Sequence, residues 1–343
     1  MGDKVMKKML CILIILSLTG FSLGTPYWIE PGVYMKYVAY QTKSIDPTSS
    51  GFGDATLQVV YNYSGKLFKI GAFGNSTVTF RVESIVNDTA IVSVEISMEY
   101  PKILYSTEGK TLDFSPFWDN NSVIWMVHNK SKTTGKYILE IVLRNLTLKG
   151  KYKIDLKTGD VYDLRGRYHG KTILWYDVAN PFKINETICV DSEGREVKID
   201  RITVSNISFL TYYKTFKPPI ITIKTTIGVL KTPTSKVIGR NVMIYDGSSG
   251  ILISFLAPNF PDAKAAGFPV LYGFDMKGFE LSRKEWKRED IQIGGGLVLL
   301  DTNADLIKTR LINYSEKTSK LNYIYLLLLL LFILSLLVKR GER

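Results

Sequence analysis

The clearest sign of how this chain folds is the stretch from Thr77 to Met98, which reads TVTFRVESIVNDTAIVSVEISM. Apolar and polar side chains alternate on both sides of a polar interruption that begins at Asn87. A period of two is typical of strands with one buried face, because successive side chains point to opposite faces of a sheet. The stretch therefore predicts two antiparallel strands joined as a hairpin.

The length of the loop sets the register of this hairpin. Residues that lie opposite each other share a face, so apolar residues must meet apolar ones. A two-residue loop would set apolar residues opposite polar ones, whereas a three-residue loop sets Phe80 opposite Ile96. We therefore expect a three-residue loop, with Phe80 and Ile96 buried together and Arg81 close to Glu95 on the other face.

Four further turns carry a glycine where a three-residue hairpin loop would end: Gly65, Gly159, Gly194 and Gly250. Glycine enters the left-handed region of backbone space without steric cost, as the last residue of such loops often does. This placement sets Asp191 opposite Arg195 and predicts six apolar pairs: Val60 with Phe68, Ile154 with Tyr162, Tyr152 with Leu164, Cys189 with Val197, Tyr245 with Ile253, and Met243 with Phe255.

These hairpins predict an all-β, antiparallel fold built from hairpins and meanders. A meander of this length must curl or split, so we expect either an open half-barrel or a β-sandwich. The spacing loosens from Asp177 to Lys183, which suggests an N-terminal β lobe over 25–180 and a C-terminal one over 181–320. The stretch from Pro258 to Gly278 is rich in Pro, Gly and aromatic residues and is expected to form a long loop.

The two ends of the chain predict its position relative to a membrane. Residues Leu321 to Val338 contain no charge, and 18 residues of helix span about 27 Å, close to the thickness of a bilayer core. Residues 339–343 carry three basic side chains and are expected to form a cytoplasmic tail. Three lysines precede the apolar run from Met9 to Leu18, so residues 1–24 are expected to be a signal peptide. An uncleaved signal anchor is the alternative, and it gives the same topology: a single-pass plasma-membrane protein with an extracellular ectodomain.

Charge and cysteine content narrow the function classes. Without the two ends, 38 Lys and Arg oppose 30 Asp and Glu, which leaves a net charge of +8. Eleven basic residues lie between Lys130 and Lys171, and we interpret them as a solvated sheet face, with anionic lipid or acidic glycan as the alternative ligand. Nucleic acid is not expected as a partner of an exported chain. Cys189 is the one cysteine of the mature chain, so it forms no intramolecular disulfide and is expected to be buried and inert.

Nine of the fifteen asparagines lie in the sequon Asn-x-Ser/Thr, whereas the Ser and Thr content predicts about two by chance. All nine lie between the two apolar ends, as an exported glycoprotein requires. The glycosylation candidates are Asn62, Asn75, Asn87, Asn120, Asn129, Asn145, Asn185, Asn206 and Asn313.

The sequence offers no catalytic motif, no metal-ligand spacing and no cofactor fingerprint, so we expect neither enzyme activity nor a cofactor or metal. Two carboxylates that converge from distant positions remain an open route to hydrolysis. His128 is expected to pair with Glu140 across neighbouring strands. Four tryptophans are candidates for stacking on sugar rings, although aromatic residues in strands are usually core: Trp118, Trp125, Trp175 and Trp286.

The run from Pro31 to Tyr37 (PGVYMKY) and the Asp-x-x-Thr/Ser-Gly turns that begin at Asp155 and Asp246 carry a resemblance. The layout is similar to that of uncharacterised archaeal membrane-anchored extracytoplasmic β-rich surface proteins. The resemblance implies a signal peptide, a β-rich ectodomain and one C-terminal anchor, and it supplies no catalytic residues.

The first hypothesis is therefore a glycosylated cell-surface protein with a non-catalytic β ectodomain. Its expected partners are the lipid bilayer together with an envelope glycan, a lipid or another membrane protein. One alternative is a carrier in which a half-barrel cradles a hydrophobic ligand, and the other is an envelope hydrolase.

Overall fold

The computed structural model describes residues 25–109, 114–132, 134–177, 180–231, 236–284 and 290–306. The expected signal peptide, membrane span and cytoplasmic tail lie outside these residues. No helix within the described ranges is long and apolar enough to cross a membrane. The chain divides into two compact units between Asn303 and Ala304, and only 304–306 of the second are described. The fold below is that of the first unit.

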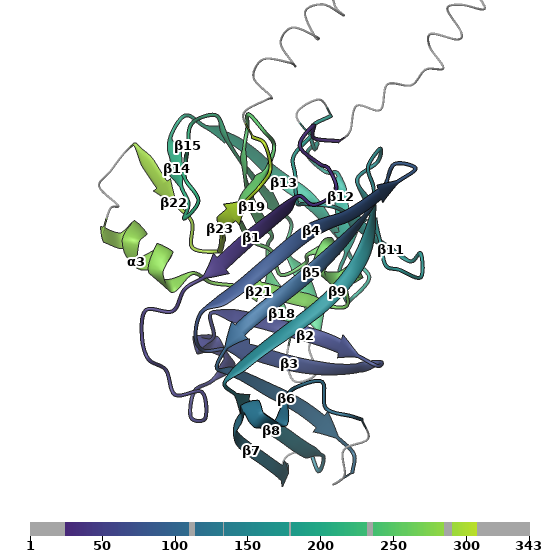
Figure 1. Ribbon diagram of the computed structural model, residues 1–343, viewed down its shortest axis with the longest axis vertical. Helices are drawn as coiled ribbons and strands as arrows, with labels where there is room; N and C mark the ends of the chain where they lie inside the picture. The colour runs from purple at the N-terminus through teal and green to yellow at the C-terminus, as the bar shows by residue number, and fades with distance from the viewer. Residues whose placement is uncertain are drawn as a thin grey trace, which may run out of the picture. The chain divides into compact units, whose positions relative to one another are not determined.

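The main sheet has twelve strands, and every neighbouring pair in it is antiparallel. Their spatial order is β11 (Tyr168–Lys171), β10 (Asp160–Tyr162), β9 (Asn145–Asp155), β5 (Thr89–Glu99), β4 (Ser76–Val86), β1 (Tyr34–Ala39), β23 (Leu297–Thr302), β20 (Leu252–Leu256), β19 (Val242–Asp246), β16 (Ile220–Thr225), β13 (Glu196–Ser205) and β12 (Thr187–Val190). Figure 1 shows β4, β5 and β9 running side by side across this sheet.

The main sheet curls until its two outer strands approach each other. Gly170 on β11 lies so close to the carbonyl oxygen of Ile188 on β12 that a side chain at Gly170 would collide with it. The all-β antiparallel prediction is confirmed, and the sheet is nearly closed. The expected boundary at Asp177–Lys183 falls inside the first unit, and strands from both sides of it belong to this one sheet.

Three smaller sheets and four short helices complete the described unit. A six-stranded sheet has the order β21 (Val270–Gly273), β2 (Leu57–Tyr63), β3 (Lys66–Ala72), β6 (Pro101–Thr107), β8 (Tyr137–Leu143) and β7 (Val123–Lys130). The others are β15 (Thr215–Phe216), β14 (Ser208–Leu210) and β22 (Ile291–Ile293), with β14 and β22 parallel, and the pair β17 (Gly228–Lys231) and β18 (Lys236–Gly239). The helices are η1 (Phe52–Asp54), η2 (Asn120–Ser122), α2 (Pro261–Ala265) and α3 (Met276–Lys284).

The prediction of a long loop from Pro258 to Gly278 is wrong, because this stretch contains α2, β21 and the start of α3. Proline occupies the first turn of α2, where its missing N–H costs no helical hydrogen bond. The glycine and proline residues of this stretch therefore lie in and between short helices and a strand, and do not indicate a long irregular loop.

The β4–β5 hairpin has the predicted faces but not the predicted partners. Phe80 and Ile96 are both fully buried, and Arg81 is exposed on the opposite face. Phe80 pairs directly with Val94 rather than Ile96, and Arg81 pairs with Ser93, which places Arg81 diagonal to Glu95 on the same exposed face.

A two-residue loop and a bulge together explain this register. The loop residues Asn87 and Asp88 have φ angles of 48° and 62°, the left-handed combination that suits a tight hairpin turn. That loop alone would set apolar residues opposite polar ones. A bulge at Glu83 inserts one extra residue in β4, so that Val82 again faces an apolar partner, Val92.

The glycine-based pairs are partly confirmed. Cys189 lies opposite Val197, and Met243 lies opposite Phe255, as predicted. A bulge moves Tyr245 opposite Leu252 instead of Ile253.

At the other two glycine turns the predicted register is wrong by one residue. The turn at Gly65 has two loop residues, so Phe68 faces Tyr61 rather than Val60. At Gly159, Ile154 faces Val161 rather than Tyr162. Glycine marked each turn correctly, but it did not fix the number of loop residues.

Aromatic side chains fill the interior of the main sheet. Tyr37 on β1 packs edge-on against Phe80 and Phe255, with ring centroids 6.2 and 5.0 Å away. Phe260 precedes α2 and lies 5.4 Å from the Phe80 ring and 5.0 Å from the Phe255 ring. Such contacts between buried rings add to the stability gained from apolar burial.

Candidate functional site

The sequon asparagines lie on the outside of the described unit. Seven of the eight that the structure describes are exposed, and Asn75 is half-buried, while Asn313 lies outside the described residues. The seven exposed ones are Asn62, Asn87, Asn120, Asn129, Asn145, Asn185 and Asn206. A glycan needs an accessible carboxamide nitrogen, and these positions provide it.

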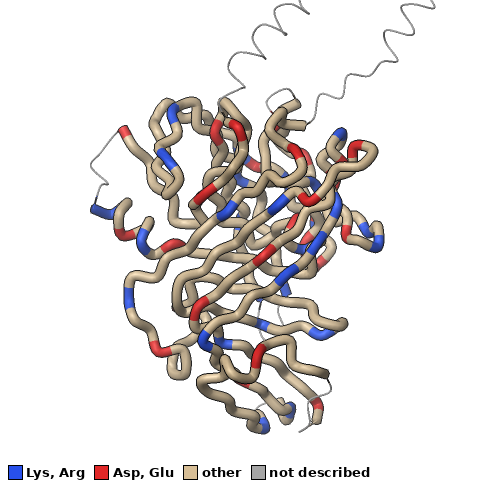
Figure 2. The backbone as a smooth tube through the Cα atoms, viewed as in Figure 1, with Lys and Arg blue, Asp and Glu red and all other residues tan. Residues whose placement is uncertain are grey.

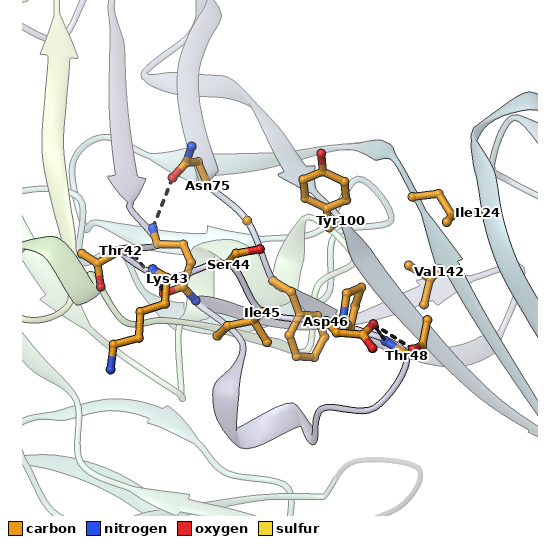
Figure 3. Close-up of a pocket in the computed structure, with 14 residues that line it drawn as sticks. Thr42, Lys43, Ser44, Ile45, Asp46, Thr48, Asn75, Tyr100, Ile124 and Val142 are labelled. Carbon is orange, nitrogen blue, oxygen red and sulfur yellow. Dashed lines mark hydrogen bonds between the residues drawn. The ribbon is translucent and has the colours of Figure 1, made fainter.

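Asn75 differs from the others because it lines a groove with a volume of about 580 Å³. This volume lies within the range of roughly 300–1,000 Å³ that is typical of small-ligand sites. The loop residues Gln41 to Thr48 line the groove together with Phe73 to Asn75, Tyr100, Ile124 on β7 and Val142 on β8. Figure 3 shows Asn75 and Tyr100 along one side of the groove and the loop along the other.

The groove lies where connections between the six-stranded sheet and the main sheet come together. Residues Phe73 to Asn75 connect β3 to β4, and Tyr100 connects β5 to β6. The two connections are hydrogen-bonded to each other: the Phe73 N–H donates to the Tyr100 carbonyl at 3.3 Å and the Gly74 N–H donates to the Glu99 carbonyl at 3.0 Å. The groove is therefore built on two mutually fixed crossings.

Tyr100 holds a strained backbone position in the second crossing. Its φ angle of 50° lies in the left-handed region, which side chains other than glycine rarely adopt. The residue is 47% exposed, a high value for a tyrosine between two strands. This aromatic was not among the stacking candidates, because the sequence carries no signal for its backbone conformation.

In the carboxamide of Asn75, the oxygen accepts a hydrogen bond and the nitrogen donates none within the described residues. Its Oδ1 accepts a hydrogen bond from the Gln41 N–H at 3.2 Å, which fixes the orientation of the group. Its Nδ2 donates no hydrogen bond within the described residues. Nδ2 is the atom to which an N-linked glycan attaches.

The three candidate tryptophans that the structure describes do not line the groove. Trp118 and Trp175 are buried at 8% and 4% exposure, and Trp125 is half-buried. Trp286 lies outside the described residues. Packing therefore accounts for the two buried tryptophans.

The buried carboxylates accept hydrogen bonds from other residues of the same chain. Asp262 accepts hydrogen bonds from the Tyr152 hydroxyl at 2.9 Å, the Thr172 hydroxyl at 2.7 Å and the Ile173 N–H at 3.1 Å. Burial raises the pKa of Asp262 to about 6, against the lowering effect of these hydrogen bonds.

Asp275 has a similar role at the start of α3. It accepts hydrogen bonds from the Tyr40 N–H at 2.9 Å, the Tyr212 hydroxyl at 2.8 Å and the Gly278 N–H at 3.0 Å. Burial raises the pKa of Asp275 above its ordinary value. The carboxylate thus ties the loop after β1 to α3.

Asp191 organises the β12–β13 turn. Burial alone would raise the pKa of its carboxyl, but backbone hydrogen bonds from Arg195, Val229 and Glu193 lower that pKa to about 2. The Arg195 guanidinium adds an ion pair at 2.8 Å. This carboxylate stays ionised and structural.

The two histidines lie in different sheets, His128 on β7 and His169 on β11. His128 lies opposite Leu139, so the predicted pair with Glu140 is wrong, and Glu140 instead contacts Lys102 at 3.3 Å. His169 lies 3.4 Å from Asp163, and burial lowers the pKa of His169. Within the described ranges, no cluster of three or more His, Cys, Asp or Glu residues is arranged to hold a metal ion.

The basic stretch includes an exposed row on the outer face of the main sheet. Lys149 and Lys151 are exposed on β9, and Lys149 forms an ion pair with Glu95 at 3.2 Å. Figure 2 shows basic residues on the long strands with acidic residues beside them. This mixture is typical of a solvated face.

Comparison with known proteins found no matching family model, no similar curated protein and no similar solved structure. Any functional assignment therefore rests on the geometry of the chain.

Proposed function

We propose that this chain is a glycosylated, single-pass cell-surface protein whose β ectodomain binds envelope components or a membrane partner without catalysis. The observation that carries the proposal is the outward position of the sequons: seven of the eight described ones are exposed, and the eighth lines an open groove. A preference for Asn beside Ser and Thr in the turns of β-rich chains accounts for part of the excess of sequons, but not for a roughly fourfold one.

The edge strand β7 supports a binding role. It is the last strand of the six-stranded sheet and pairs only with β8 within the described residues. Met126 on β7 is 58% exposed. Free edges with apolar side chains accept an extended segment of another protein as an added strand, so the partner proposed here is such a segment from a membrane or envelope protein.

Two observations favour this function over its alternatives. Tyr37, Phe255 and Phe260 fill the interior that a hydrophobic-ligand carrier would need to keep open. Asp191, Asp262 and Asp275, which a hydrolase could have used, are held by hydrogen bonds from their own chain.

The topology and the glycans are tested together on intact cells that produce the full chain. External protease should digest the ectodomain, the mature chain should begin at or near Thr25, and peptides with Asn62 and Asn87 should carry glycan mass. An ectodomain that resists external protease but is digested after the cells are permeabilised would overturn the proposal, as would unmodified sequons throughout.

Crosslinking in intact membranes, followed by mass spectrometry of the captured proteins, tests the proposed edge. Met126→Lys should reduce capture of a specific partner, because charge on an edge strand opposes strand addition. Val204→Lys is the matched control, since Val204 is 65% exposed on β13 in the main sheet. Equal capture by both variants would show that β7 is not the binding edge.

A further inference from the structure

We propose that the groove beside Asn75 is the binding site for the glycan carried by Asn75 itself. The inference rests on the proposed function, because it requires that the chain is N-glycosylated. It adds that one glycan is bound by its own protein and packs over the junction of the two sheets, while the others extend into solvent.

The attachment point is part of the groove wall. Asn75, Ser76 and Thr77 form a complete sequon, and Asn75 is the one described sequon asparagine that lines the groove. The hydrogen bond from the Gln41 N–H holds Oδ1, so the free Nδ2 has a fixed direction. Figure 3 shows Oδ1 of Asn75 turned toward the loop and Nδ2 turned away from it, so the first sugar begins at the rim of the groove and the following sugars extend over it.

The groove offers surfaces that suit a sugar chain. Tyr100 and Ile124 are 47% and 51% exposed and supply an aromatic ring and an apolar side chain. Sugar rings have apolar faces that pack on such groups, and burying these two side chains would release ordered water.

Gln41, which lines the groove, carries a hydrogen-bond donor without a partner. Nε2 of Gln41 is buried and has no partner within the described residues, while Oε1 of the same side chain accepts from the Thr42 N–H at 2.9 Å. A buried donor without a partner is unfavourable, and a sugar hydroxyl in the groove would supply the missing acceptor.

Asn87 provides an internal comparison. It lies at the tip of the β4–β5 hairpin, is exposed, and is not among the residues that line the groove. A glycan on Asn87 would extend into solvent, and one on Asn75 would be covered on one side by protein.

The test measures how fast a peptide N-glycanase releases each glycan from the folded full chain, made in an N-glycosylating cell line. Release converts the asparagine to aspartate, so mass spectrometry reads each site separately. We expect release from Asn75 to be slower than release from Asn87 by about tenfold or more, and both rates to become equal after denaturation. Tyr100→Ala and Ile124→Ala should each bring the Asn75 rate towards the Asn87 rate.

Two variants at Thr77 compare the chain with and without the Asn75 glycan while Asn75 itself stays unchanged. Thr77→Ser keeps the sequon, whereas Thr77→Val removes the required hydroxyl and keeps the hydrogen bond between Gln41 and Asn75. We expect Thr77→Val to lower the Tm relative to Thr77→Ser when the chain is glycosylated. Made in a host that does not N-glycosylate, both variants keep asparagine at position 75 and differ only at position 77, so the Tm deficit of Thr77→Val relative to Thr77→Ser should be lost there.

The outcomes separate this inference from the function on which it rests. Equal release from Asn75 and Asn87 in the folded chain would overturn the inference and leave the glycoprotein intact. An unmodified Asn75 beside a modified Asn87 would do the same. Absence of glycan at every sequon would instead refute the proposed function.

Discussion

The hydroxyl of Tyr152 donates a hydrogen bond of 2.9 Å to the carboxylate of Asp262, and both side chains are completely buried. Tyr152 lies on β9 of the main sheet, and Asp262 lies in the first turn of α2. This contact fastens the short helix to the inner face of the sheet. It also places an ionisable group where water cannot stabilise its charge.

The first prediction concerns the pH dependence of stability. Burial raises the pKa of Asp262 from 3.8 to about 6 in the folded chain, so the folded chain binds this proton more tightly than the unfolded chain. The contribution of Asp262 to stability is therefore fully present below about pH 4 and is lost as the pH rises through about 6. The loss amounts to roughly 3 kcal/mol between pH 4 and pH 7.

Asp262→Asn removes this titration. We expect the free energy of unfolding of the original chain, minus that of the variant, to fall by roughly this amount between pH 4 and pH 7. Urea denaturation at a series of pH values measures both curves. Parallel curves for the two proteins would show that Asp262 has the same pKa in the folded and unfolded chains.

The second prediction compares two neighbours on β4. Phe80→Ala should lower the free energy of unfolding by about 3–5 kcal/mol, because it empties a packed aromatic site between Tyr37 and Phe260. Arg81→Ala should cost no more than about 1 kcal/mol, because the exposed guanidinium contributes a stacking contact over Tyr34 and one exposed hydrogen bond of 3.2 Å to the Gly32 carbonyl. Equal losses in chemical denaturation would contradict the assignment of the two faces.

The third prediction compares two glycines that both have room for a Cβ atom but differ in backbone conformation. Gly65 has a φ angle of 81° and Gly51 has no positive φ angle, and neither has an atom within 4 Å of an added Cβ. Gly65→Ala should therefore cost about 1–2 kcal/mol, whereas Gly51→Ala should be neutral or stabilising by up to about 1 kcal/mol. A pair of thermal melts decides the matter, and similar effects at both sites would speak against the two-residue turn at Gly65.

The fourth prediction concerns the thiol of Cys189. It is 5% exposed, and burial raises its pKa to about 12. Because the thiolate is the reactive form, iodoacetamide should modify Cys189 in denaturant and leave it unmodified in the folded chain at pH 8. Peptide mass spectrometry identifies the site, and rapid labelling of the folded chain would mean that the contact of β11 with β12 opens.

In the hairpin from Thr77 to Met98, local pattern was sufficient for strand positions and for the side of the sheet that each residue faces. The alternation from Thr77 to Met98 placed Phe80 and Ile96 in the core and Arg81 in solvent, because a side-chain period of two is a property of the strand itself. Glycines 194 and 250 likewise marked turns whose registers hold at Cys189 and Met243. Seven of the eight described sequon asparagines also lie at the surface, as a polar amide in a turn or on an outward strand face usually does.

Partners across the sheet needed the tertiary structure. The bulge at Glu83 adds one residue, and its one trace in the sequence is the polar pair Glu83-Ser84, which shifts the alternation between Val82 and Ile85 without showing which partner each residue meets. The same limit explains His128, which faces Leu139 instead of Glu140. A shift of one residue depends on turn geometry and on strands far away in the sequence.

The groove at Asn75 was beyond the reach of the sequence for a related reason. Asn75, Tyr100 and Ile124 are separated along the chain, and they meet because two crossings between sheets are hydrogen-bonded at one place. The sequence by itself determined that the chain forms antiparallel strands with sequons on their outer parts, since both follow from local patterns. Which strands became neighbours, and therefore which sequon lies in a groove, was decided by packing among residues that no local pattern connects.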